Sequence, residues 1–306
     1  MVGTEFLTVF KQVVILFILI FIGFFCSKKK IFTEEGIKSI TKFVLFFVTP
    51  CVIINSFNRT FDSHVLKNLG IVSLLAVGVH IINILLARLL VREKEDSRLR
   101  VYRYGVIFSN CGYMALPLQS ALLGNEGVFY GAAFIAVFNL FTWTYGVAEM
   151  GGKISLKKIF LNPGVIGIGI GLVLFLTPFK LPYVLEIPVA SLAALNTPLP
   201  MLVIGFYLSK IESLRIIGNL SFVWSVFFRL IFAPMVILGL LYVLQIKGII
   251  SHVIIIACTT PAAANTTMFA ALYNRDKEVA AAMVSISTLF AIVTMPLIIT
   301  LAMKLC

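Results

Sequence analysis

Long apolar runs separated by short polar connections dominate the chain. A run of about 20 apolar residues is long enough to cross the hydrocarbon core of a membrane as a helix. The pattern predicts ten such spans: Phe6–Phe25, Ile37–Phe57, Leu66–Val91, Val101–Leu123, Val128–Ala148, Ile159–Phe179, Ile187–Leu208, Leu220–Leu244, Ile249–Leu272 and Val279–Met303. We therefore expect an all-α integral membrane protein.

Two of the predicted spans are interrupted by residues that weaken helices. The fourth span contains Asn110, Gly112 and Pro117, and the ninth contains Pro261 and Asn265. Glycine lacks side-chain restraint, and proline removes a backbone donor and clashes with the preceding turn. Backbone groups freed at membrane depth are tolerated only when they are buried in protein or line a polar cavity. Paired interruptions in the two halves of a chain therefore indicate the binding site of a transporter.

The two halves also share smaller features. Thr49-Pro50 in the second span corresponds to Thr197-Pro198 in the seventh, and Leu140-Phe141 in the fifth corresponds to Leu289-Phe290 in the tenth. A repeat unit of five spans is odd, so the second copy enters the membrane in the opposite orientation. The sequence thus predicts two inverted five-helix repeats, with a site near the midplane where the copies meet.

Composition and charge agree with a membrane protein. The chain is 60% hydrophobic and 12% charged, whereas a soluble domain has about 25% charged residues. The net charge of +12 would suggest nucleic acid in a soluble protein. Here it marks cytoplasmic loops, so we expect the lipid bilayer, and no nucleic acid, as a partner.

The basic residues lie mostly in alternate connections. One side carries Lys28, Lys29, Lys30, Lys38, Arg92, Lys94, Arg98, Arg100, Arg103, Lys153, Lys157, Lys158, Lys210, Arg215, Arg275 and Lys277, and the other has mainly Arg59, Lys67, Lys180, Lys247 and Lys304. The richer side is predicted to face the cytoplasm. Both termini of this multi-pass plasma-membrane protein then face outward, as an even number of spans requires.

No Asp or Glu falls at the centre of a predicted span. Proton relays and many cation sites use intramembrane carboxylates, whereas Asn, Ser, Thr and helix N-termini suit an anion. We predict these substrate-binding residues: Asn110, Asn265, Ser109, Tyr113, Thr260 and Thr266. The five cysteines form no C-x-x-C pair, so we expect no metal site, no cofactor and no disulfide framework.

Each of these residues also has a plainer interpretation. Membrane Asn often bonds between helices, Ser and Thr bond their own helix backbone, and Tyr113 fits a packing role equally well. His80 in the third span either packs or carries protons. Arg229 in the eighth either takes part in coupling, snorkels toward the cytoplasmic face or bonds backbone carbonyls.

The residues around the two interruptions resemble a known family. Ser109–Leu118 is similar to the fourth-span signature of the auxin efflux carrier family. Pro261–Asn265, followed by Phe269-Ala270 and Tyr273-Asn274, is similar to that family's second signature, in the ninth span. The stretch Ser287–Leu297 is similar to that family's last span. The resemblance covers nearly the whole chain. It implies ten spans in two inverted repeats, with crossed broken helices in spans four and nine.

The resemblance also implies an elevator-type carrier of organic anions, such as auxin in plants and malonate or malate in bacterial relatives. A scaffold would comprise residues 1–60 and 153–212, often with the dimer contact, and a moving domain would comprise 61–152 and 213–306. Only Glu149–Lys158 connects spans five and six. Lacking the large loop of the long plant forms, the chain fits the compact, bacterial-like branch. Asn265 stands where plant exporters tend to be more apolar.

The predicted function is therefore a secondary transporter of a small organic anion, a mono- or dicarboxylate. A cation/proton antiporter or a channel of similar crossed-helix architecture stays open as an alternative. An intramembrane enzyme is disfavoured, because the chain has no H-E-x-x-H motif and no intramembrane Asp pair.

Overall fold

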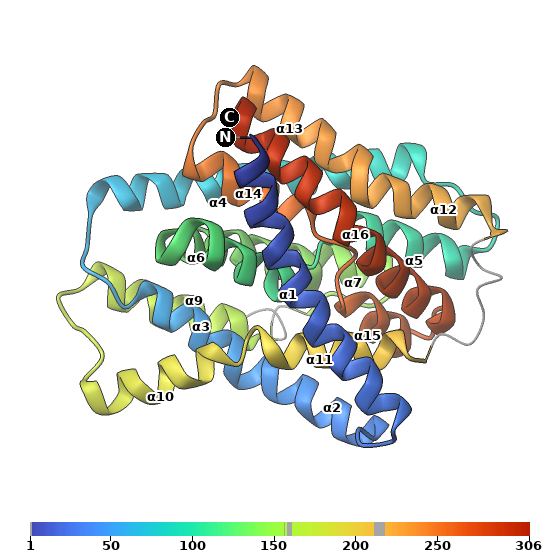
Figure 1. The fold of residues 1–306 in the computed structure, drawn as a ribbon, viewed down its shortest axis with the longest axis horizontal. Coiled ribbons are helices and arrows are strands. Elements are labelled where there is room, and N and C mark those ends of the chain that lie inside the picture. Colours follow the sequence, from blue (N-terminus) through green and yellow to red (C-terminus); the bar gives the residue numbers. More distant parts are fainter. Residues whose placement is uncertain (1, 156, 158–160, 211–217) are drawn as a thin grey trace.

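The computed structural model describes residues 2–155, 157, 161–210 and 218–306, and every regular element in them is a helix (Figure 1). The α-helices are α1 (Val2–Lys28), α2 (Glu34–Phe43), α3 (Thr49–Phe57), α4 (Ser63–Leu90), α5 (Asp96–Ile107), α6 (Leu116–Phe141), α7 (Val147–Glu149), α9 (Pro163–Leu176), α10 (Tyr183–Ala194), α11 (Pro198–Leu208), α12 (Leu220–Phe227), α13 (Ala233–Val243), α14 (Ile249–Thr259), α15 (Asn265–Leu272) and α16 (Lys277–Leu305). Four π-helical turns continue them: η1 (Val44–Val48), η2 (Cys111–Ala115), η3 (Thr142–Gly146) and η5 (Phe228–Phe232).

Seven helical stretches in this part of the chain are long and apolar enough to cross a membrane. They are Phe6–Lys28, Glu34–Phe57, Ser63–Leu90, Cys111–Glu149, Tyr183–Leu208, Leu220–Val243 and Lys277–Leu305. This confirms the prediction of a helical membrane protein, whereas the inverted repeat of ten spans stays a prediction. The predicted start of the sixth span at Ile159, together with Lys158 and Arg215, lies outside the described residues.

Gly124 divides the longest of these stretches. Its φ of 66° and ψ of −157° are non-helical and interrupt α6 at the connection expected between the fourth and fifth spans. A positive φ of this kind is strained for residues with a Cβ and free for glycine. Glycine is therefore the residue that this corner requires.

Close glycine contacts bring α1 against α11 and α3 against α9. A Cβ added at Gly205 of α11 would meet the carbonyl oxygen of Ile20, and one at Gly23 of α1 would meet the carbonyl oxygen of Leu202. On the second pair, a Cβ at Gly167 would lie 2.9 Å from Cα of Pro50. Small residues let helix backbones approach closely in membranes, where packing rather than hydrophobic burial drives association.

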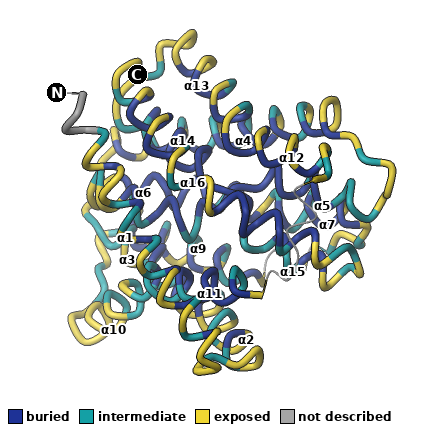
Figure 2. Tube along the Cα trace, turned by 45° about the vertical axis from the view of Figure 1, so that its right-hand side comes forward, coloured by how far each residue is buried: buried dark blue, intermediate teal, exposed yellow. Residues whose placement is uncertain are grey.

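The outside of the molecule is strongly apolar. Leu74, Val184 and Leu220 are 72%, 78% and 82% exposed, and α10 has no buried residue along its length (Figure 2). Large exposed apolar side chains are unfavourable in water and suit the acyl chains of lipid. The surface thus agrees with burial of these helices in a bilayer.

The start of α1 and the end of α16 lie on the same side of the molecule (Figure 1, Figure 2). Both lie toward the top of Figure 1, and α1 packs against α16. The backbone N–H of Gly248, between α13 and α14, donates a 2.7 Å hydrogen bond to the carbonyl of Cys306. The described ends of the chain therefore share one side of the molecule.

Candidate functional site

Two broken helices cross and pair with each other. The helix α5 ends at Ile107 and η2 begins at Cys111, while α14 ends at Thr259 and α15 begins at Asn265. Phe108 and Thr260, which directly follow α5 and α14, are extended, with Thr260 at φ −66° and ψ 153°. Because both interruptions fall inside apolar segments, their freed backbone groups need partners within the protein.

The two breaks supply those partners. Ser109 and Ala262 form an antiparallel bridge. The N–H of Asn110 donates to the carbonyl of Pro261, and the N–H of Ala263 donates to the carbonyl of Phe108, each at 2.9 Å. This short ladder resembles one rung pair of a β-sheet. It explains how two unwound segments remain stable among helices.

The break in the first helix lies just before the residues that predict it. Gly112 belongs to η2, which runs on into α6, so Pro117 lies inside a continuous helix and its missing N–H leaves a carbonyl of the preceding turn without a helical donor. Pro261 lies inside the second break. Gly112 has no neighbour within 4 Å of an added Cβ, so its role is not to admit a close contact.

A small cavity of about 40 Å³ lies against the crossing and gathers several predicted substrate residues. Ser109, Asn110, Tyr113 and Asn265 line it, and Thr49 and Asn139 contribute from other helices. Asn110 is only 3% exposed, and its Nδ2 has no hydrogen-bond partner among the described residues. A buried amide donor without an acceptor is costly unless something else supplies one.

Thr260 and Thr266 do not line this cavity. The Thr260 hydroxyl donates to the carbonyl of Ala257 at 2.9 Å, the local bond that threonine often makes with its own helix. The Thr266 side chain is fully buried on α15. Four of the six predicted residues therefore line the small cavity at the crossing, and Thr260 and Thr266 do not.

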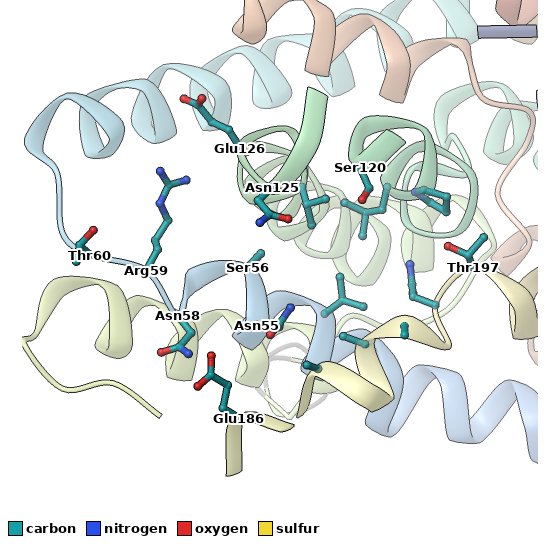
Figure 3. A pocket seen from close by; sticks show the side chains of 18 residues that line it. Asn55, Ser56, Asn58, Arg59, Thr60, Ser120, Asn125, Glu126, Glu186 and Thr197 are labelled. Carbon is teal, nitrogen blue, oxygen red and sulfur yellow. The ribbon is translucent and has the colours of Figure 1, made fainter. Parts of the chain in front are cut away.

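A much larger cavity, of about 800 Å³, lies between α3, α6 and α10 (Figure 3). Its lining includes Arg59, Glu126 and Glu186 from the loops and helix ends, and Pro117 and Asn196 toward the crossing. The guanidinium of Arg59 lies 5.0 Å from the ring centroid of Phe129. This cavity is wide enough for a hydrated small molecule.

A third cavity, of about 50 Å³, lies beyond the crossing, with Thr41, Tyr207 and Pro200 in its lining. Tyr113 and Asn265 line both small cavities. The three cavities follow one another along α2, η1 and α3, since Thr41 lines the third, Thr49 the small cavity at the crossing and Val52 the large one.

Asn196 is a functional candidate that the sequence analysis missed. Its Nδ2 donates to the carbonyl of Gly112 at 3.2 Å, and its Oδ1 has no partner in the described part of the chain. It joins the connection between α10 and α11 to the start of η2. The neighbouring Thr197-Pro198, matched by Thr49-Pro50, was the available signal.

His80 packs in an aromatic cluster on α4. It is 2% exposed, and its ring stacks on Phe141 at 4.9 Å and lies 5.5 Å from Phe134. Its Nδ1 lies 2.7 Å from the carbonyl of Ala76. A carbonyl can only accept, so Nδ1 carries the proton and donates.

Arg229 is buried within η5, and its hydrogen-bond partners among the described residues are all backbone carbonyls. Its Nη1 donates to Val106 at 2.9 Å, its Nε donates to Thr260 at 3.2 Å, and its Nη2 donates to Cys258. The exposed fraction of Arg229 is 1%, which leaves no room for snorkelling to the surface. Of the interpretations given above, bonding to carbonyls is the one that these contacts match.

Metal chemistry has no ready ligand set in the part of the chain described. No group of three or more His, Cys, Asp or Glu side chains converges there, and the cysteines are free thiols. The small cavity at the crossing is lined instead by amides, hydroxyls and apolar groups. Such a lining can hold a solute by hydrogen bonds.

Comparison with known proteins identifies the family of the chain. A family model described as "Membrane transport protein" matches residues 8–155 and 151–299. The chain belongs to this family of membrane transporters. The family is that of the auxin efflux carriers, which confirms the resemblance seen around the two breaks.

Two archaeal relatives match this transporter along nearly their whole length. An "Uncharacterized transporter MJ1031" from Methanocaldococcus jannaschii is 26% identical over 299 residues, covering 93% of this chain and 96% of the relative. An "Uncharacterized transporter" from Methanothermobacter thermautotrophicus is 20% identical over 301 residues, covering 94% and 96%.

Proposed function

We propose that this membrane transport protein is a secondary carrier of a small organic anion, a mono- or dicarboxylate, which binds at the crossing. The observation that carries the proposal is the buried amide of Asn110, whose Nδ2 faces no acceptor among the described residues. A carboxylate oxygen is an acceptor that would satisfy it, and Asn265 lines the same cavity.

The electrostatics of the crossing support an anion. Both η2 and α15 begin beside the small cavity. The start of a helix carries partial positive charge and unpaired N–H groups, which favour a negative ligand. No charged side chain lines the small cavity in the part of the chain described. A cation there would find carbonyl dipoles and no carboxylate.

The size of the cavities supports a carrier that moves during transport. The cavity of about 40 Å³ at the crossing is far smaller than the roughly 300–1,000 Å³ of a typical small-molecule pocket. A carboxylate with its carbon skeleton requires the half-helices to separate from α3 and α11. We propose that they slide as one body, in an elevator-type alternation, against a scaffold that contains the closely packed pairs α1–α11 and α3–α9.

The proposed placement in the membrane uses all ten predicted spans, arranged as two inverted repeats. The shared side of the chain ends fits an even number of crossings (Figure 1). On this placement both termini face outward from the plasma membrane, and the 800 Å³ cavity opens outward beside Arg59 and Glu186. A homodimer would use the scaffold, whose α10 has no buried residue in the single chain.

Flux into proteoliposomes tests the function. Labelled mono- and dicarboxylates are offered under an imposed potential, with and without pH and sodium gradients. A carrier saturates and shows counterflow, whereas a channel does neither. Saturable flux of a cation, without flux of any organic anion, would overturn the proposal.

Two substitutions test the site. Asn110→Ala and Asn265→Ala remove one polar contact each, which costs about 1–3 kcal/mol, or roughly 5–150-fold in affinity. Asn83→Ala is the matched control, because Asn83 is equally buried, at 3% exposed, on α4 away from the three cavities. Wild-type affinity in both site variants would remove the crossing as the binding site.

A further inference from the structure

Arg229 has an unusual position for a charged side chain. It lies within η5 at the level of the two breaks, and its three carbonyl partners come from two different helices. Val106 belongs to the last turn of α5, Cys258 belongs to the last turn of α14, and Thr260 directly follows α14. One guanidinium therefore joins the ends of both half-helices.

These carbonyls are available because both helices stop there. The last four carbonyls of a helix have no partner within it, and together they carry partial negative charge. Two such ends meeting within one protein core create a cluster of oxygens without donors. In broken-helix transporters, half-helix C-termini and unwound carbonyls are the groups that coordinate a sodium ion.

The charge of Arg229 is not neutralised by an acid in the described residues. The ion pairs there involve Lys38, Arg98, Arg100, Arg103 and Arg275. A guanidinium stays protonated in proteins. The guanidinium of Arg229 therefore keeps a positive charge that, among the described residues, backbone carbonyls alone contact by hydrogen bonds.

We propose that Arg229 is the built-in cation of the crossing. Its guanidinium occupies the oxygen cluster that a bound sodium ion would otherwise fill, so this carrier works without a co-transported metal cation at that position. The proposal rests on the anion-carrier function proposed above. It adds that the carrier takes up no cation from the medium to stabilise the two broken helices at their crossing. Arg229 acts as a positioning residue, through the two helix ends rather than on the substrate.

The first test uses wild-type protein in liposomes. Anion uptake under a fixed potential is measured in sodium medium and in medium where choline replaces sodium. Equal rates are expected. A requirement for sodium overturns the inference while leaving the carrier function intact. Absence of anion uptake in both media counts against the proposed function instead, and the second test then decides the inference.

The second test uses chemical rescue. Arg229→Ala leaves space beside three buried carbonyls, and we expect it to lose at least about tenfold in transport. Millimolar guanidinium should restore transport and raise its melting temperature in detergent. Arg229→Met is the matched control, because its neutral side chain fills the space and leaves no room for guanidinium. Arg229→Lys keeps the charge and should transport better than Arg229→Met.

Two results of the rescue experiment would overturn the inference. One is wild-type transport by Arg229→Met, which would show that the charge is dispensable. The other is an equal response of Arg229→Ala and Arg229→Met to guanidinium in melting temperature, which would show that the ion acts elsewhere. The melting measurement requires no transported substrate, so it stands even where no anion is found.

Discussion

The contact between α1 and α11 yields a prediction whose size follows from the structure. Gly205 of α11 lies so close to α1 that an added Cβ would meet the carbonyl oxygen of Ile20 and lie 2.6 Å from the backbone nitrogen of Phe24. Both atoms belong to backbone, so neither can rotate away. Gly205→Ala must therefore push the two helices apart.

The displacement sets the expected loss of stability. Non-bonded heavy atoms pack best at 3.5–4.0 Å, so α1 and α11 must separate by on the order of 1 Å. Overpacking of this kind costs about 1–3 kcal/mol. Alanine also stabilises a helix by up to about 1 kcal/mol relative to glycine. A control that shares this gain is therefore needed.

Gly169→Ala supplies that control. Gly169 lies within α9, and an added Cβ there meets nothing within 4 Å. The two variants share the gain in helix propensity, so their difference isolates the packing cost of about 1–3 kcal/mol. At about 2–4 °C per kcal/mol, Gly205→Ala should melt roughly 2–12 °C below Gly169→Ala. The measurement is thermal unfolding of purified protein in detergent. Equal melting temperatures would refute the close backbone contact.

Three further predictions concern a helix cap, an ion pair and the topology. Asn162 caps α9 by accepting from two backbone N–H groups, so Asn162→Ala should cost about 0.5–2 kcal/mol while Asn162→Asp should not, as thermal unfolding would report. The hydrogen bond from Arg100 holds the pKa of Asp96 below its usual value. The stability from this pair is therefore present at neutral pH and lost as pH falls through the lowered pKa, so the melting temperatures of wild type and Asp96→Asn should converge in acid. In a cysteine-free background, Lys304→Cys should react with an impermeant maleimide from outside and Lys153→Cys only after permeabilisation; the reverse pattern would contradict the proposed orientation.

Local pattern was enough to predict the interrupted helices. Gly112, Pro117 and Pro261 weaken helices wherever they occur in an apolar run, so the two breaks could be expected without coordinates. The residues at which each break begins and ends could not be predicted, because Gly112 lies inside the π turn η2 and the unwound residues precede it. Pro117 neither ends nor begins a helix, because η2 runs directly into α6 around it.

Contacts between residues far apart in the chain could not be predicted from the sequence, for a different reason. Asn196 bonds to the carbonyl of Gly112, 84 positions away. Arg229 finds carbonyls on two helices, 29 to 123 positions away. Such partners are set by how the helices pack, and a single sequence shows only that an Asn or an Arg lies inside an apolar run. The glycine contact between α1 and α11 is similar, since an isolated Gly205 in a helix has no visible partner.

The π-helical turns bear on how this transporter is aligned with its relatives. A π turn bonds i to i+5 and so holds one residue more than the α-helix around it. Losing one residue from η1, η3 or η5 would let each helix run on as continuous α, while the residues before and after the turn keep their faces, because the π turn alone accommodates the extra residue. Relatives that are only 20–26% identical are therefore expected to differ by single-residue gaps inside these spans as well as in loops. An alignment that forbids such gaps would put the wrong residue opposite Arg229, which lies in η5 itself.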